Sequence, residues 1–273
     1  MQIATNPMAL MAVNAVNMAN RAVGVASERI STGLRINRAS DDPAGMLIAN
    51  RLKTQITSVA KAISNVSQGV AMTQLVDSSL SQMADILSNM RVTAVSAANA
   101  SSDAYAADYQ DAMDAYISEI DSIASDATWN SSSLMNTDST VAIQAGSQSG
   151  DTISIDFTET TASSLAVSGL SVSTVSDAST AIDTIDTAID TLSQYQSYMG
   201  AMANVMTAHS DALSGVSLAY TTAYGNTVNA DMAQETANLA SAQIQRDGAT
   251  AMLAQANGMN KEIVAFLLKS VTG

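Results

Sequence analysis

The chain has 273 residues, only 4% aromatic side chains and a formal net charge of −14 at pH 7. It has no cysteine, which excludes disulfides and thiolate metal sites, and its two prolines at positions 7 and 43 leave no proline kink beyond residue 43. This composition suits long helices packed side by side better than one deep globular core.

Charge is distributed very unevenly along the chain. Residues 1–63 carry seven basic and three acidic side chains, whereas residues 92–245 carry eighteen acidic side chains and no Lys or Arg. The acidic body would repel phosphates, so nucleic acid is not expected as the main partner. The simplest interpretation is a solvated acidic surface; the alternative is a basic arm that docks on acidic segments of its own or of neighbouring copies.

The N-terminus lacks the pattern of a cleavable secretory signal. Its first twenty residues contain no basic side chain, and Pro7 and four asparagines interrupt any apolar stretch. No run of about 18 apolar residues occurs anywhere, so the sequence predicts no membrane insertion.

Residues 8–30 predict a first helix with a weak heptad seam, that is, a line of apolar side chains spaced alternately by three and four residues along one face of the helix. The seam consists of Met and Ala with one Val, and it would bury too little surface to offset the entropy of ordering the helix. We therefore expect a partner helix. The seam positions are Met8, Met11, Ala15, Met18, Ala22 and Val25.

Residues 33–43, which follow this helix, are typical of a turn between two helices. Gly33 can end the first helix because it tolerates a positive φ. Asp41 and Asp42 can cap the next helix, and Pro43 suits a first helical position.

From Pro43 to about Asn99 the pattern predicts one long helix with two seams joined by an irregular step. The seams are Leu52, Ile56, Val59, Ile63, Val66 and Val70, then Val76, Leu80, Met83, Leu87, Met90 and Ala94.

The middle of the chain predicts a shorter helix, a loop and a β-hairpin. The helix spans residues 103–127, with one face formed by Tyr105, Tyr109, Ala112, Tyr116, Ile120 and Ile123. The loop begins at Trp129. Residues 141–145 and 153–157 alternate with period two around a glycine-containing turn, which is typical of a hairpin.

Heptad patterning returns over residues 178–224 and thins after Val228. The earlier seam is built from Ile182, Ile185, Ile189, Leu192, Met199, Met202, Met206 and Leu213. The later one contains Met232, Leu239, Ala242, Ala249, Leu253 and Ala256.

Two separate motifs resemble the terminal signatures of bacterial flagellins. Near the N-terminus these are residues 30–37 (Ile-Ser-Thr-Gly-Leu-Arg-Ile-Asn) and 41–45 (Asp-Asp-Pro-Ala-Gly). Near the C-terminus they are Asp-Met-Ala-Gln-Glu from residue 231, Met-Leu-Ala-Gln-Ala-Asn from residue 252 and Leu-Leu-Lys from residue 267. Residues 225–229 (Gly-Asn-Thr-Val-Asn) depart from the family pattern and lack two family arginines.

The resemblance implies a mainly α fold, an elongated rod of long antiparallel coiled-coil helices with one β-hairpin at about 141–157 and paired N- and C-terminal helices. Residues 1–40 and 226–273 are expected to form the inner filament-core coiled coil, and residues 41–225 an outer helical rod domain. Only about twenty polar residues follow the hairpin, so the variable outer domains of many flagellins are absent.

The function implied is a self-assembling, extracellular subunit of the flagellar filament that serves motility. Its partners would be further copies of itself, an export chaperone, the type III export apparatus, and the hook-associated junction and cap proteins. The alternatives are the hook–filament junction protein and, in a different class, a coiled-coil exported adhesin.

The predicted subunit-packing residues are Met11, Met18, Leu34, Ile36, Leu52, Ile56, Met232, Leu239, Leu253 and Leu267. The segment that resembles the innate-receptor motif of responsive flagellins is degenerate here, with Asn89, Arg91, Val92 and Thr93 at the matching positions.

No catalytic or cofactor site is expected. His209, Ser210 and Asp211 are the residue types of a hydrolase triad, but neighbours on a helix diverge by about 100° and cannot relay a proton. Asp183 and Asp186, with Asp190, could hold a hard cation but fit a solvated helix face. The sixteen methionines fit gap-filling seam positions, so no metal is expected.

Overall fold

The computed structural model describes residues 6–272, except for the side chains of residues 260, 263 and 266–272. The chain divides into unit 1, formed by residues 1–54 and 220–273, and unit 2, formed by residues 55–219. The functional division expected at residues 40 and 226 stays a prediction. Within the described residues, no helix is both long and apolar enough for a membrane span.

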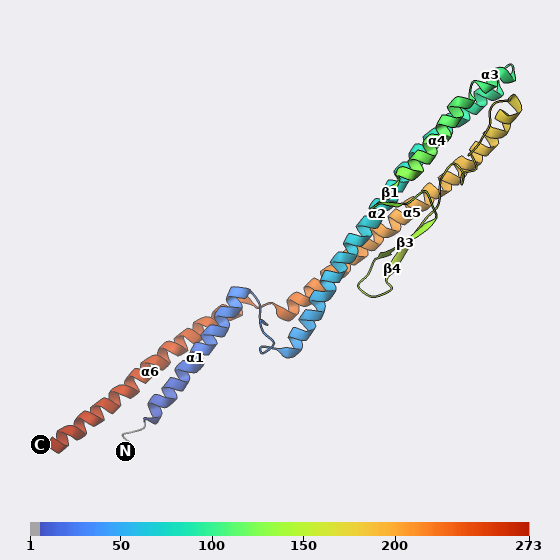
Figure 1. Ribbon diagram of the computed structural model, residues 1–273. Coiled ribbons are helices and arrows are strands. Elements are labelled where there is room, and N and C mark those ends of the chain that lie inside the picture. Colours follow the sequence, from blue (N-terminus) through green and yellow to red (C-terminus); the bar gives the residue numbers. More distant parts are fainter. Residues whose placement is uncertain (1–5, 273) are drawn as a thin grey trace. The chain divides into compact units, whose positions relative to one another are not determined.

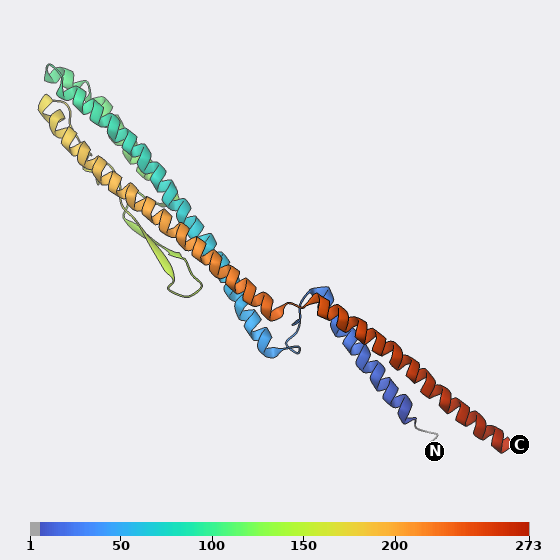
Figure 2. The same ribbon diagram turned by 180° about the vertical axis from the view of Figure 1, so that it is seen from behind.

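Unit 1 is built on the antiparallel pair of helices α1 (Pro7–Thr32) and α6 (Met232–Thr272) (Figures 1 and 2). Asn6 caps α1 by accepting a hydrogen bond from the Ala9 N–H, and its own amide donates to the Ala256 carbonyl at 2.9 Å. Gly33 ends α1 at φ 71°, as its sequence position predicts. The first turns of α2 (Pro43–Ala98) and the last turns of α5 (Val175–Val228) complete unit 1.

Unit 2 contains the larger core. The remainder of α2 and α5 run beside α4 (Gln110–Asp126), as both ribbon views show (Figures 1 and 2). The second predicted seam of α2 is confirmed, because all six of its residues are fully buried. Large buried side chains from the other elements include Met113, Ile120, Leu134, Ile155, Phe157, Ile185, Leu192 and Met199.

The predicted helix over residues 103–127 is interrupted. It forms α3 (Asp103–Ala107) and α4, because the Tyr109 N–H bonds to the Ala106 carbonyl three residues back and tightens the chain there. The predicted apolar face was therefore wrong for Tyr105, Tyr109 and Ala112, which are exposed, and is confirmed for Ile120, which is buried. The other buried residues of these two helices are Ala106, Met113 and Ala124.

Two small antiparallel sheets follow. The stretch after residue 127 is a tight hairpin, β1 (Thr128–Trp129) and β2 (Ser132–Ser133), whose two turn residues Asn130 and Ser131 both have positive φ. The predicted longer hairpin is confirmed as β3 (Ser139–Gln144) and β4 (Thr152–Phe157), with Ser139 opposite Phe157 and Gln144 opposite Thr152.

The longer hairpin lies against α2 at Gly69. A side chain there would meet the Met206 sulfur at 2.7 Å and the Ile143 and Ile155 side chains at 3.4 and 3.6 Å. The glycine thus lets the hairpin pack directly on the helix.

Candidate assembly surface

The contact between the terminal helices is built almost entirely from alanine. The buried residues of α1 are Ala12, Ala19 and Ala26, seven positions apart, as expected for one stripe of a coiled coil. On α6 the facing stripe contains buried Ala242 and Ala256 together with half-buried Leu239 and Leu253. This confirms the later predicted seam, apart from Met232, which is exposed.

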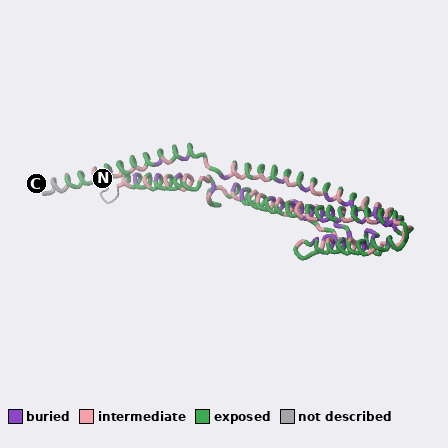
Figure 3. Tube along the Cα trace, turned by 90° about the horizontal axis from the view of Figure 1, so that it is seen from above, coloured by how far each residue is buried: buried purple, intermediate pink, exposed green. Residues whose placement is uncertain are grey.

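The predicted seam of α1 was wrong as the face that packs on α6. The stripe that does so is displaced by one residue, because small alanines let two helices approach closely where methionines would hold them apart. Met11 and Met18 are consequently 72% and 64% exposed, and Met8 and Val25 are exposed as well. Figure 3 shows that most residues of both terminal helices are exposed. An apolar stripe along α1 is thus left largely exposed to solvent within the described chain.

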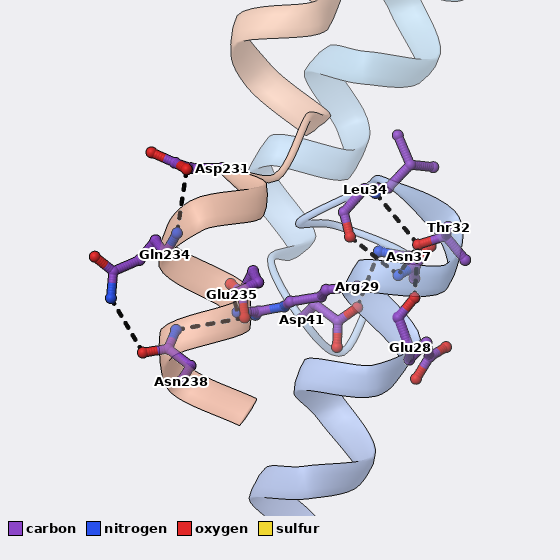
Figure 4. Close-up of polar contacts among 10 residues, drawn as sticks. All are labelled: Glu28, Arg29, Thr32, Leu34, Asn37, Asp41, Asp231, Gln234, Glu235 and Asn238. Atoms are coloured by element: carbon purple, nitrogen blue, oxygen red, sulfur yellow. Dashed lines mark hydrogen bonds and ion pairs between the residues drawn. The ribbon is translucent and has the colours of Figure 1, made fainter. Parts of the chain in front are cut away.

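An ion pair links the facing ends of the two helices (Figure 4). The Arg29 Nη1 lies 3.0 Å from the Glu235 Oε1, and the Glu235 side chain is only 9% exposed. Arg29 lies in the last turn of α1 and Glu235 in the first turn of α6. Each charge therefore also complements the dipole of its own helix. Asn238 donates a further hydrogen bond to the Glu235 carboxylate.

Backbone hydrogen bonds join the same two segments just beyond the helix ends. Leu34 and Asn229 form an antiparallel bridge. The Arg35 N–H donates to the Val228 carbonyl at 2.7 Å, and the Ala230 N–H donates to the Gly33 carbonyl at 2.9 Å. We call residues 29–45 together with 225–235 the joint. It connects the two ends of the sequence by main-chain contacts that do not depend on side-chain identity.

The turn within the joint is fixed by its two aspartates. The Asp41 carboxylate accepts hydrogen bonds from the Arg38 and Asn37 N–H groups at 2.9 and 3.0 Å, and these bonds lower its pKa. Asp42 accepts from the Gly45 N–H at 2.9 Å. A side chain at Gly45 would collide with the Asp42 carboxylate and come within 2.6 Å of Ile36. The hydrogen bonds to the two aspartates and the close packing of Gly45 against Asp42 and Ile36 therefore set the direction in which α2 begins.

The structure places the predicted packing residues in different environments. Ile36 is buried beside Gly45, and Leu34 is half-buried at the bridge. Leu52, Ile56, Leu239 and Leu253 are half-buried, whereas Met11, Met18 and Met232 are exposed. The side chain of Leu267 lies outside the described residues. The role of these residues between subunits stays a prediction.

The predicted receptor segment lies on the surface of α2 within unit 2. Asn89 and Val92 are exposed, and Thr93 is half-buried and bonds back to the Asn89 carbonyl. Arg91 forms a bidentate pair with Asp186 of α5, with Nε–Oδ1 and Nη2–Oδ2 distances of 2.6 and 3.2 Å. This pairing lowers the pKa of Asp186 and raises that of Arg91.

Two of the remaining candidate residues, His209 and Asp186, have structural partners. The His209 Nε2 lies 2.8 Å from the Ala145 carbonyl, so this side chain holds the end of the β3–β4 hairpin on α5 rather than merely covering the helix. Asp186 faces Arg91 rather than its neighbouring aspartates. In the part of the chain that the structure describes, no three His, Cys, Asp or Glu side chains gather in a metal-binding arrangement.

Sequence reasoning missed a pair of tyrosines that covers the free edge of β4. Tyr195 and Tyr198 stack with ring centroids 6.4 Å apart, and their hydroxyls accept from the Thr158 and Asp156 N–H groups at 2.8 and 3.2 Å. Burial raises the pKa of Tyr195 to about 12. The pair satisfies N–H groups that an open strand edge would otherwise expose. The spacing of three residues between Tyr195 and Tyr198 indicates that both tyrosines lie on one face of a helix. Nothing in the sequence indicates that this face contacts the hairpin.

Comparison with known proteins covers most of the chain. The family model described as the bacterial flagellin N-terminal helical region matches residues 3–140, and the one described as the bacterial flagellin C-terminal helical region matches residues 182–267. A flagellin of Halalkalibacterium halodurans is 31% identical over 246 residues, which cover 89% of this chain and 90% of that protein.

Two further comparisons differ in extent. A flagellin of Listeria monocytogenes is 30% identical over 94% of this chain and 96% of its own length. A flagellin of Serratia marcescens is 35% identical over 64% of this chain, but the match spans only half of that protein. The chain thus corresponds to nearly the whole of some relatives and to part of longer ones.

Proposed function

This chain belongs to the bacterial flagellin family, and we propose that its terminal helix pair is the surface through which it polymerises. The protein is a structural subunit of the extracellular bacterial flagellar filament. It is a short form, since 273 residues leave no room for large outer domains between the two matched regions.

The observation that carries the proposal is the solvent-exposed apolar stripe of α1. The contact of α1 with α6 buries three alanines, while Met8, Met11, Met18 and Val25 stay exposed. Burying a methionine side chain contributes roughly 1.5–3 kcal/mol. Contacts with neighbouring copies can therefore add apolar burial that the contact between α1 and α6 leaves unused. Repetition of such a non-closing contact generates a helical polymer.

The other functional expectations follow from family membership. We propose that the subunit has no enzymatic activity and carries its load mechanically. We also propose that it leaves the cell through the type III export apparatus with the help of an export chaperone. In the assembled flagellum it would contact the hook-associated junction and cap proteins.

A substitution in the exposed stripe tests the proposal. Met18→Glu places a carboxylate on the stripe, and burying that charge without a partner between subunits is strongly unfavourable. Met18→Leu is the matched control because it keeps an apolar side chain of similar size. We expect the Leu variant to form filaments like the parent, and the Glu variant to remain monomeric at the same concentration, as judged by sedimentation and electron microscopy. Normal filaments from the Glu variant would remove Met18 from the polymerising surface.

A further inference from the structure

The methionines are sorted by exposure between the two units. Among the described residues, all exposed methionines lie in unit 1: Met8, Met11, Met18, Met232, Met252 and Met259. All buried ones lie in unit 2: Met72, Met83, Met90, Met113, Met135, Met199 and Met206. Half-buried Met46 and Met202 lie one in each unit. An oxidant in solution therefore reaches the exposed thioethers of the terminal helices and is kept from the seven buried ones of unit 2.

Four of the exposed methionines line a single groove between α1 and α6. Met8 and Met11 come from α1, and Met252 and Met259 from α6; the volume of the groove is about 310 Å³. The other lining residues are Ala12, Ala15, Ala249, Ala256 and Gln255. Gln255 is the one side chain among them that can donate a hydrogen bond, so the groove suits apolar thioethers and offers little to a polar oxygen.

We propose that Met8, Met11, Met252 and Met259 form an oxidation site at which peroxides convert the groove thioethers to sulfoxides and thereby block polymerisation. This inference rests on the proposed function of the terminal helix pair as the polymerising surface. The modification acts on the monomer, whose groove is open to solvent.

The chemistry is a two-electron oxygen transfer. The thioether sulfur attacks one peroxide oxygen, the O–O bond breaks, and an S–O bond forms. Sulfur is oxidised by two electrons. With hydrogen peroxide, the proton on the transferred oxygen passes to the other oxygen, which leaves as water. A thiol-dependent methionine sulfoxide reductase reverses the step, with the sulfoxide oxygen leaving as water while two thiols become a disulfide.

The product is poorly suited to an apolar contact between subunits. A sulfoxide oxygen is a strong hydrogen-bond acceptor, and its burial without a donor is unfavourable. Several sulfoxides in one groove are therefore expected to raise the protein concentration required for filament formation by at least about tenfold.

Peptide mapping of the full-length monomer tests the reactivity. After brief treatment with dilute hydrogen peroxide, we expect oxygen addition at the groove methionines well before the seven buried methionines of unit 2. Oxidation of the buried set at the same rate would overturn the proposal. This measurement does not depend on polymerisation, so it remains decisive even if the untreated protein forms no filaments, which would count against the proposed function instead.

Polymerisation assays then test the consequence. Peroxide-treated protein should fail to polymerise at the concentration sufficient for untreated protein, and methionine sulfoxide reductase should restore it. Unchanged polymerisation of protein shown to carry groove sulfoxides would overturn the proposal. The experiment with the reductase uses the parent protein only, so its outcome does not depend on whether a variant folds.

Two sets of substitutions locate the effect. The variant with Met8→Leu, Met11→Leu, Met252→Leu and Met259→Leu should lose markedly less of its own polymerisation after peroxide than the parent does, although Met18 can still be oxidised. The matched control, Met232→Leu, removes an exposed methionine that lies outside both the groove and the apolar stripe of α1, and it should stay as sensitive to peroxide as the parent. Inhibition of the four-site variant as strong as that of the parent, or resistance of the control, would place the sensitive site elsewhere.

Discussion

Single residues at the joint determine how the chain turns from α1 into α2. Gly33 supplies the positive φ, Asp41 and Asp42 satisfy backbone N–H groups, and Gly45 leaves space for Ile36. These residues lie within the motif that identified the family. Their roles are local and geometric, which explains why a short, contiguous motif can carry so much information.

The two glycines Gly45 and Gly24 should respond oppositely to the same substitution. Gly45→Ala forces a methyl group against Asp42 and Ile36, and such overpacking costs about 1–3 kcal/mol. Gly24→Ala meets no atom within 4 Å and should stabilise α1 by about 0.5–1 kcal/mol. Urea unfolding of each monomer, followed by circular dichroism, measures both changes. Shifts of the same sign would show that the close approach at Gly45 is unimportant.

The degenerate segment on α2 predicts a weak response of the vertebrate innate receptor for flagellin. Of the residues matching the responsive motif, only Arg91 retains a charge, and it is paired with Asp186. The loss of central anchors from an interface typically costs a few kcal/mol. A reporter-cell assay should therefore give much lower potency than a responsive flagellin, and the triple variant N89R, V92E and T93L should recover part of it. Equal potency of the parent protein would contradict the prediction.

At the scale of elements, the two units differ in what they bury. Along α2, unit 2 packs Leu80, Met83, Leu87 and Met90 at full burial, whereas α1 buries only alanines. A buried methyl group contributes about 0.8 kcal/mol, less than the ~1–2 kcal/mol needed to order one backbone residue. The terminal helices thus depend on further contacts, whereas unit 2 has its own core.

Deletion of either terminal segment should abolish polymerisation without unfolding unit 2. Removing residues 1–30 deletes most of α1, and removing residues 240–273 deletes most of α6, while the buried residues of unit 2 remain. We expect soluble, helical monomers by circular dichroism and no filaments in sedimentation or microscopy. If either deletion variant forms normal filaments, the pairing of the terminal helices is dispensable for assembly.

The sequence predicted the elements better than it predicted their contacts. Helix ends at Gly33 and Pro43, the hairpin, and the seam from Val76 to Ala94 follow from local chemistry and periodicity, and the structure confirms them. The packing face of α1 could not be chosen, because its Met and Ala stripes are adjacent and similarly spaced. The Arg29–Glu235 pair joins residues about two hundred positions apart, so no local pattern could indicate it.

At the scale of the whole molecule, the charge pattern places every trypsin site outside the central acidic region. Lys and Arg occur only up to Arg91 and from Arg246 onward. The sites up to Arg38 and from Arg246 onward belong to the thinly packed terminal segments, whereas Lys61 and Arg91 lie on the well-packed part of α2. Proteolysis follows the population of locally opened states, so trypsin reports on how well each end is packed.

Limited trypsin digestion of monomer and filament, followed by intact-mass measurement, tests most directly whether polymerisation orders the terminal helices. In the monomer we expect rapid trimming of both ends and a persistent acidic fragment that contains residues 92–246. In the filament the same terminal sites should be protected, because neighbouring copies cover the exposed faces of α1 and α6. Equal cleavage of the ends in both forms would contradict the account, because the terminal helices could not then be the surface that assembly buries.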